Sequence, residues 1–142
     1  MTKKIKLEVA YEWKGLVLAL VSPWPDYKLA WKLSKVLNIE LGRQNDLSIP
    51  YPGDKKNSFL LYQFKNEYTT FRLLKNRAYQ VENSNQPFLL PEIKDFDYIF
   101  LLESEAELDI GRISELIREI ESVQLLKSFN PETLKSKQNI AF

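Results

Sequence analysis

The stretch that decides the fold runs Leu89-Leu90-Pro91-Glu92-Ile93-Lys94-Asp95-Phe96-Asp97-Tyr98-Ile99-Phe100-Leu101-Leu102-Glu103. It begins with a proline-containing turn, passes three carboxylates, and then has five consecutive apolar residues at 98–102. An apolar run of one strand's length, followed by a helical pattern, is typical of a strand that is buried on both faces. We therefore predict that residues 98–102 form the centre of a sheet.

The composition predicts one α+β domain over residues 1–142 and limits its chemistry. The net charge of +1 gives no bulk attraction to nucleic acid or to anionic membranes. The chain has no cysteine and no histidine, which removes disulfides, a thiolate nucleophile and the commonest general base and metal ligand. No apolar run is long enough to span a bilayer. We expect a cytoplasmic protein that binds no membrane and no DNA and carries no cofactor.

Two strands and a helix are expected in the first forty residues. Residues 7–11 alternate between apolar and charged, and residues 16–21 are continuously apolar, as in strands. The two segments pair as a hairpin, or residues 1–14 are a loose lead-in strand; the sequence leaves both open. Ser22-Pro23-Trp24-Pro25 then breaks the second strand.

A helix is predicted at residues 26–37, capped by Ser22 or Asp26 and ended by Asn38. At 100° per residue it has an apolar face and an opposite basic face. The apolar face consists of Tyr27, Ala30, Trp31, Leu33 and Leu37, and the basic face of Lys28, Lys32 and Lys35.

The middle of the chain reads as strands separated by polar loops. We predict a short strand at 45–49 that ends at Pro50, and a loop through residues 50–57. Residues 58–64 and 68–74 are predicted to form a hairpin, and residues 75–86 a loop. After the central strand, residues 109–121 form an amphipathic helix with Asp109 as N-cap. A return strand at 122–129 and a polar C-terminal tail at 130–142, which starts with a turn or short helix, complete the chain.

This order predicts an α+β fold with a mostly antiparallel sheet of five to seven strands. Right-handed crossovers would place both helices on one face of that sheet. The predicted architecture is a ferredoxin-like two-layer sandwich. Residues 99–129 look like half of an ACT domain, which is an analogy of fold that carries no function.

The turn before the central strand also resembles a sequence motif. Leu90-Pro91-Glu92, three further residues and then Phe96-Asp97-Tyr98 are similar to the motif that names the IPExxxVDY family of uncharacterised bacterial proteins. Leu90 replaces isoleucine and Phe96 replaces valine, and both changes are apolar. Residues 26–31 and 134–139 also look like segments of that family. The resemblance implies a small cytoplasmic protein and no particular activity.

Glu92, Asp95 and Asp97 form the one carboxylate cluster in an otherwise apolar setting. They would suit Mg²⁺ or an acid/base pair, which makes a metal-assisted enzyme one alternative. We favour a structural role, in which Glu92 accepts N–H groups of the turn that Pro91 starts and Asp97 anchors the strand. No phosphate loop or activated serine is recognisable, so we predict no catalytic residue, no metal ligand and no enzymatic activity.

A second alternative is an RNA-associated protein that uses either a sheet face or the Lys28, Lys32 and Lys35 ridge. Sheets of this topology that bind RNA stack bases on exposed aromatic side chains. The candidates are Tyr62, Tyr68, Phe71 and Tyr79, with further lysines at positions 55, 56, 135 and 137. We favour core aromatics and a solvated helix face instead.

The charge is unevenly distributed along the chain. Residues 82–121 carry eleven acids and three bases, whereas the first helix has only lysines on its outer side. These ridges would pair with a partner or with a second copy about a two-fold axis, or they neutralise each other within one molecule. Trp13 and Trp31 are predicted to be core or core-rim, and Trp24, between two prolines, is the best exposed anchor. We predict a non-catalytic protein-interaction domain, with Trp24, Lys28, Lys32 and Lys35 as partner-binding residues and a homodimer or protein complex as the assembly.

Overall fold

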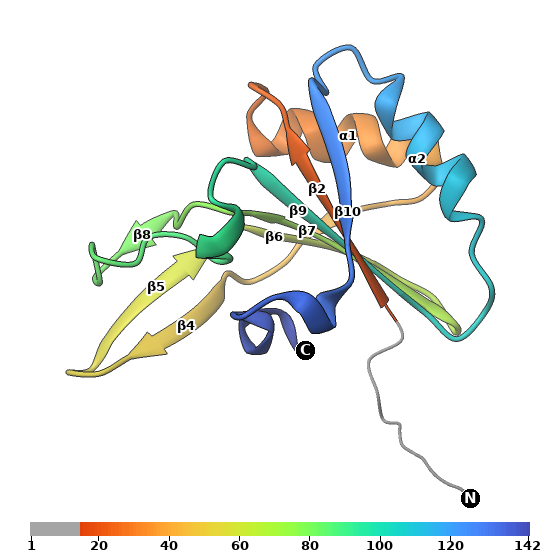
Figure 1. Cartoon of the computed structure of the whole chain (residues 1–142). Coiled ribbons are helices and arrows are strands. Elements are labelled where there is room, and N and C mark those ends of the chain that lie inside the picture. The colour runs from red at the N-terminus through yellow and green to blue at the C-terminus, as the bar shows by residue number, and fades with distance from the viewer. Residues whose placement is uncertain (1–14) are drawn as a thin grey trace, which may run out of the picture.

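A six-stranded antiparallel sheet forms the centre of the protein, with the strand order β10-β2-β9-β7-β6-β3 (Figure 1). The computed structural model describes residues 15–142, and the strand expected at residues 7–11 lies outside this range. The six strands are β2 (Gly15–Val21), β3 (Gly42–Arg43), β6 (Leu61–Lys65), β7 (Thr69–Lys75), β9 (Tyr98–Ser104) and β10 (Leu125–Phe129). The α+β class and the antiparallel sheet are thereby confirmed. Within the described residues, β2 pairs with β10 through residues 17–21 and with β9 through residues 15–20.

Strand β9 is the central strand that the sequence predicts. It pairs with β2 on one side and with β7 on the other. Tyr98 to Leu102 are all at most 1% exposed. Because side chains alternate along a strand, Tyr98, Phe100 and Leu102 enter one hydrophobic cluster, and Ile99 and Leu101 enter a second one on the opposite face. Each face of the sheet therefore has its own core.

The helices α1 (Asp26–Leu37) and α2 (Ile110–Arg118) cover the first face and contact each other (Figure 1). Asp109 caps α2 as predicted, because its carboxylate accepts the Arg112 N–H at 3.0 Å. Helix α2 ends three residues earlier than predicted. Helix α1 has the predicted bounds, and Asn38 ends it in the left-handed conformation with φ 55°. Its N-cap is Pro25, which makes no side-chain cap, so the expectation of Ser22 or Asp26 is wrong.

The buried face of α1 is not the one predicted. Leu29, Ala30 and Leu33 are buried, whereas Tyr27 is 69% and Trp31 is 55% exposed. The predicted apolar face included Tyr27 and Trp31 because both are hydrophobic, without regard to the charged residues beside them on the helix. At 100° per residue, Trp31, Lys28 and Lys35 fall within about 60° of arc, opposite Leu33. The spacing therefore places Trp31 among the lysines of the outer face.

A separate three-stranded sheet contains β4 (Leu47–Tyr51), β5 (Lys55–Phe59) and β8 (Gln80–Val81). Pro50 was expected to end the first of these strands, but it lies within β4 opposite Lys56. Proline is accepted there because β4 is an edge strand, where one side of the backbone has no partner strand. The loops predicted at 50–57 and 75–86 thus contain strands, and the strand predicted at 58–64 divides at Leu60 between the two sheets.

The second face of the central sheet is covered by the C-terminal residues and by the turn before β9. The C-terminal segment contains the short 3-10 helices η2 (Pro131–Thr133) and η3 (Lys137–Ile140), and the turn contains η1 (Pro91–Ile93). Leu134 and Ile140 are 5% and 1% exposed and pack against Val17, Ile99 and Leu101. The prediction of a polar tail at 130–142 is wrong for these two side chains. The sheet is consequently covered on both faces, not on one as in the predicted two-layer sandwich.

We predict that Ile140→Ala lowers the free energy of unfolding by roughly 2–4 kcal/mol, because it leaves a cavity in the second core. Urea denaturation followed by tryptophan fluorescence measures this. Leu125→Ala is the matched control, since Leu125 is 51% exposed and its truncation should change stability by less than about 1 kcal/mol. Equal effects of the two substitutions would show that the C-terminal segment contributes nothing to the core.

Candidate interaction surface

The turn that carries the Leu-Pro-Glu and Phe-Asp-Tyr residues is held from inside by Asn76. This side chain is 1% exposed. Asn76 makes five hydrogen bonds of 2.7–3.1 Å, all with main-chain groups of residues 89–97. Its side-chain amide donates to the Ile93 and Phe96 carbonyls, and its side-chain oxygen accepts from the Leu90 N–H. Its backbone N–H donates to the Asp97 carbonyl, and its own carbonyl accepts from the Leu89 N–H. Buried main-chain groups need such partners. Nothing in the sequence around Asn76 indicated this role.

Glu92 ties this turn to the C-terminal segment. One carboxylate oxygen accepts the Ser136 N–H at 2.9 Å and the other accepts its hydroxyl at 2.6 Å. Partial burial alone would raise the pKa of Glu92, but the hydrogen bonds from Ser136 outweigh it and hold the pKa below its usual value. We expected Glu92 to cap its own turn; its carboxylate instead holds a segment 44 residues away.

Asp97 and Tyr98 hold the turn between β2 and α1. The Asp97 carboxylate accepts the Ser22 N–H at 2.9 Å, and the Tyr98 hydroxyl donates to the Trp24 carbonyl at 2.6 Å. Burial, together with the charges of Asp26 and Asp97, raises the pKa of Tyr98. The motif-like stretch therefore contacts the C-terminal segment through Glu92 and the β2–α1 turn through Asp97 and Tyr98.

The metal hypothesis is not supported by this arrangement. Glu92 binds Ser136, Asp97 binds Ser22, and Asp95 is exposed. Within residues 15–142, no group of three or more acidic side chains is placed to hold a metal ion. The three carboxylates act separately, so they do not form the cluster that their sequence spacing suggested.

The most prominent exposed feature is the α1 outer face, by which we mean Tyr27, Lys28, Trp31 and Lys35. The Lys28 ammonium lies 4.3 Å from the ring centre of Trp24, and that of Lys35 lies 5.3 Å from the ring centre of Trp31. These are cation–π distances. Trp24 was predicted to be the exposed anchor, but it is half-buried against the first core, and of the two tryptophans within residues 15–142 it is Trp31 that is exposed. The prediction for Trp13 lies outside the described residues.

The lysines of the predicted basic ridge differ in their partners. Lys32 lies 3.8 Å from the Glu121 carboxylate, which neutralises one position between the two helical segments. In the part of the chain that the structure describes, Lys28 and Lys35 have no ion pair. Within one molecule, Glu121 therefore neutralises Lys32, whereas the charges of Lys28 and Lys35 beside Trp31 are not neutralised by an ion pair among the described residues.

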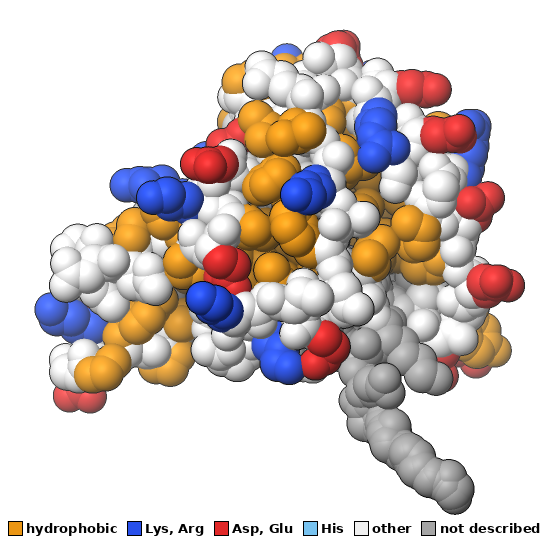
Figure 2. Space-filling model, viewed as in Figure 1, with side chains coloured by type: hydrophobic (Ala, Val, Ile, Leu, Met, Phe, Trp, Pro, Cys, Tyr) orange, Lys and Arg blue, Asp and Glu red, His pale blue; other side chains and the backbone are white. Residues whose placement is uncertain are grey.

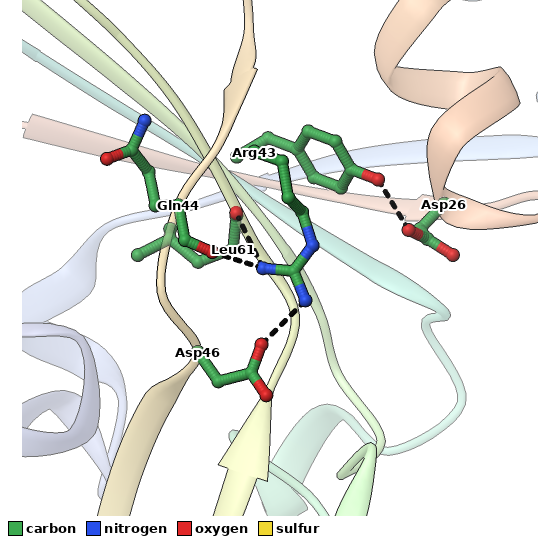
Figure 3. Close-up of polar contacts among 6 residues, drawn as sticks. Asp26, Arg43, Gln44, Asp46 and Leu61 are labelled. Atoms are coloured by element: carbon green, nitrogen blue, oxygen red, sulfur yellow. Dashed lines mark hydrogen bonds and ion pairs between the residues drawn. The ribbon is translucent and has the colours of Figure 1, made fainter.

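A polar cluster fixes the start of α1 (Figure 3). The Tyr62 hydroxyl donates to the Asp26 carboxylate at 2.6 Å, and the Arg43 guanidinium lies 5.7 Å from the Tyr62 ring centre. Arg43 in turn pairs with Asp46 at 2.6 Å and donates to the carbonyls of Gln44 and Leu61. Burial, followed by the hydrogen bond and charge of Asp26, raises the pKa of Tyr62 to about 12. The α1 outer face is thus carried by a helix whose first turn is anchored.

The aromatic side chains proposed for RNA stacking do not form one surface. Tyr62 and Phe71 are 8% and 5% exposed and belong to the core under the helices. Tyr68 and Tyr79 are exposed, but Tyr68 lies in the β6–β7 turn and Tyr79 lies beyond β7. Neither face of the central sheet offers these four rings together.

Comparison with known proteins assigns no relative. No protein-family model matches the chain, and no curated protein matches it. The similarity to the IPExxxVDY family stays a prediction. None of the helices within residues 15–142 has the length and apolar content needed to cross a membrane.

We predict that Asn76→Leu lowers the free energy of unfolding by about 3 kcal/mol, because it removes the side-chain partner of the Leu90 N–H and of the Phe96 carbonyl and one of the two hydrogen bonds to the Ile93 carbonyl. Chemical denaturation measures the change. Asn85→Leu is the control, since Asn85 is exposed, and it should cost less than about 0.5 kcal/mol. A similarly small loss for Asn76→Leu would contradict the role of Asn76.

We predict that Glu92→Gln flattens the acid side of the stability profile. The native pKa of Glu92 lies below its usual value, so its contribution is fully present above the unfolded-state pKa and is lost as pH falls through the native one. Between about pH 5 and pH 3, wild-type stability should fall more steeply than that of the variant. At neutral pH the difference should stay below about 1 kcal/mol, because the pair is exposed.

Denaturant titrations across this pH range measure the profile, with Asp95→Asn as the control, since the structure shows no hydrogen bond to the Asp95 side chain. If the stability of wild type and of Glu92→Gln depended on pH in the same way, Glu92 would not contribute to the pH dependence of stability, and the prediction would be wrong.

Proposed function

We propose that this protein is a non-catalytic protein-interaction domain that docks through the α1 outer face. The observation that carries the proposal is the exposure of Trp31, at 55%, between Lys28 and Lys35 on one side of an anchored helix. Tryptophan and tyrosine dominate the binding energy of protein interfaces when they enter a pocket on the partner. Tyr27, 69% exposed one turn earlier, extends the same surface.

The core in this proposal is ferredoxin-like and related to ACT domains. The order β10-β2-β9-β7, with α1 following β2 and α2 joining β9 to β10, supports it. Strands β6 and β3 then extend the sheet, and the small sheet of β4, β5 and β8 is inserted between α1 and β9. We further propose membership of the IPExxxVDY family and a cytoplasmic location, supported by the motif-like residues 90–98 and by the absence of cysteine.

The partner in this proposal is a protein, either another chain or a second copy. RNA binding is not favoured, because two of the four candidate aromatic residues are in the core and the net charge is only +1. The metal-assisted alternative is not favoured either, because Glu92 and Asp97 are hydrogen-bonded to separate segments.

We predict that Trp31→Ala weakens assembly roughly tenfold or more without lowering stability, because its ring is exposed in the single chain and would be buried in the complex. Sedimentation velocity measures self-association, and affinity capture with and without nuclease measures binding to other chains. Tyr79→Ala is the control, since Tyr79 is 61% exposed away from α1.

A specific assembly that depends on Trp31 and not on Tyr79 would support the proposal. A chain that stays monomeric and captures no protein in a Trp31-dependent manner would end it. Capture that disappears on nuclease treatment would favour the RNA alternative instead.

A further inference from the structure

We infer that the α1 outer face binds a second copy of this chain, with Trp31 of each protomer entering an acid-rimmed hollow of the other. This inference rests on the proposed docking function and names the partner. It follows from three features of the described residues: an exposed aromatic side chain between cations, a hollow with aliphatic side chains in its lining, and exposed acids that are sequence neighbours of two lining residues.

The hollow lies where β2 begins, β9 ends and the chain turns toward α2. It has a volume of about 220 Å³. Polar atoms and aliphatic side chains both line it, and the lining residues are Gly15, Leu16, Leu102, Ser104, Ala106, Leu108 and Ile110. The aliphatic side chains in this lining offer a protruding tryptophan an apolar surface to contact.

We call the stretch Glu105-Ala106-Glu107-Leu108-Asp109 the rim, because Ala106 and Leu108 line the hollow and the three acids are their neighbours in sequence. Its three acids are exposed, and within residues 15–142 none of them makes an ion pair. Figure 2 shows acidic side chains along the right edge of the molecule, where α2 and the loop before it lie. The rim therefore alternates negative and apolar side chains.

The α1 outer face has the complementary alternation of positive and aromatic side chains. Lys28 and Lys35 are about 10.5 Å apart along the helix axis, at 1.5 Å per residue. Glu105 and Asp109 are at most about 13 Å apart along the chain, at 3.3 Å per residue. Because this limit exceeds the lysine spacing, the chain between Glu105 and Asp109 is long enough for both lysines to meet carboxylates while Trp31 enters the hollow between them.

Pairing of two α1 helices with each other is disfavoured, because it would place like charges in contact. Each protomer instead offers one basic surface and one acidic hollow. Two copies that exchange both contacts about a two-fold axis satisfy both surfaces, which is the commonest symmetry of homo-oligomers. The complementary charges also predict that the dimer weakens as salt concentration rises.

The test uses reciprocal charge reversal in the full-length chain, with assembly measured by sedimentation equilibrium. One variant carries Lys28→Glu with Lys35→Glu, and the other carries Glu105→Lys with Glu107→Lys; Asp109 is kept because its carboxylate also caps α2. Each variant alone should dimerise at least roughly tenfold more weakly than wild type. An equimolar mixture should regain dimerisation, because both contacts in the mixed dimer are again between opposite charges.

Two further variants separate this contact from a general effect of charge. Ala106→Gln, which adds bulk without charge, should weaken the dimer by obstructing the hollow, and Lys55→Glu with Lys56→Glu should leave it intact, since these exposed lysines lie on β5. Circular dichroism and thermal unfolding show whether each variant is folded. These measurements read the fold independently of assembly.

A monomeric wild type at roughly 1 mM, a dimer that ignores both charge reversals, or a mixture that fails to reassociate would each overturn the inference. If the wild type is monomeric but captures another protein through Trp31, the inference is wrong and the proposed docking function is still supported. A dimer independent of Trp31 and of both reversals would contradict the inference and the α1 docking surface together. Assembly beyond two copies would overturn the two-fold arrangement.

Discussion

The fold depends on how the chain enters its central strand. Strand β9 is buried on both faces and paired on both edges, and the turn that leads into it packs its inner side on the buried Asn76. The Asn76 amide bonds to main-chain groups of this turn, because it offers donors and an acceptor in one plane. A fully bonded buried amide specifies one backbone path, because any other path leaves several polar groups unsatisfied.

The same turn organises segments that are far apart in the sequence. Glu92 holds the C-terminal segment, whose Leu134 and Ile140 close the second core, and Asp97 and Tyr98 hold the turn that leads into α1. A short stretch of polar residues thus connects both faces of the sheet. This explains in structural terms why a proline, two acids and an aromatic residue occur together before an apolar strand.

Packing of the first core does not require the aromatic side chains on the outside of α1. Leu29, Ala30 and Leu33 already bury that helix, and Tyr62 anchors its first turn through Asp26. Trp31 and Tyr27 are large apolar groups that the fold leaves in water. Such exposure on a well-anchored element is typical of a binding surface, and the lysines beside the rings favour an anionic counterpart.

The sequence alone determined three of the local elements, namely β9, α1 and the start of α2. Hydrophobic run length placed β9, the 3.6-residue period and Asn38 bounded α1, and Asp109 marked the start of α2. Only the tertiary structure decided the division of residues 58–64 between two sheets, the covering of the second face by the C-terminal segment, and the partners of Glu92, Asp97 and Asn76. The reason is physical: periods and caps arise from neighbours within a few residues, whereas the side chains of Glu92, Asp97 and Asn76 bond to groups 14 to 75 residues away. The exposure of Trp31 depends on both. The sequence gives the angular position of Trp31 on α1, but the elements that pack against α1 determine how wide its buried face is.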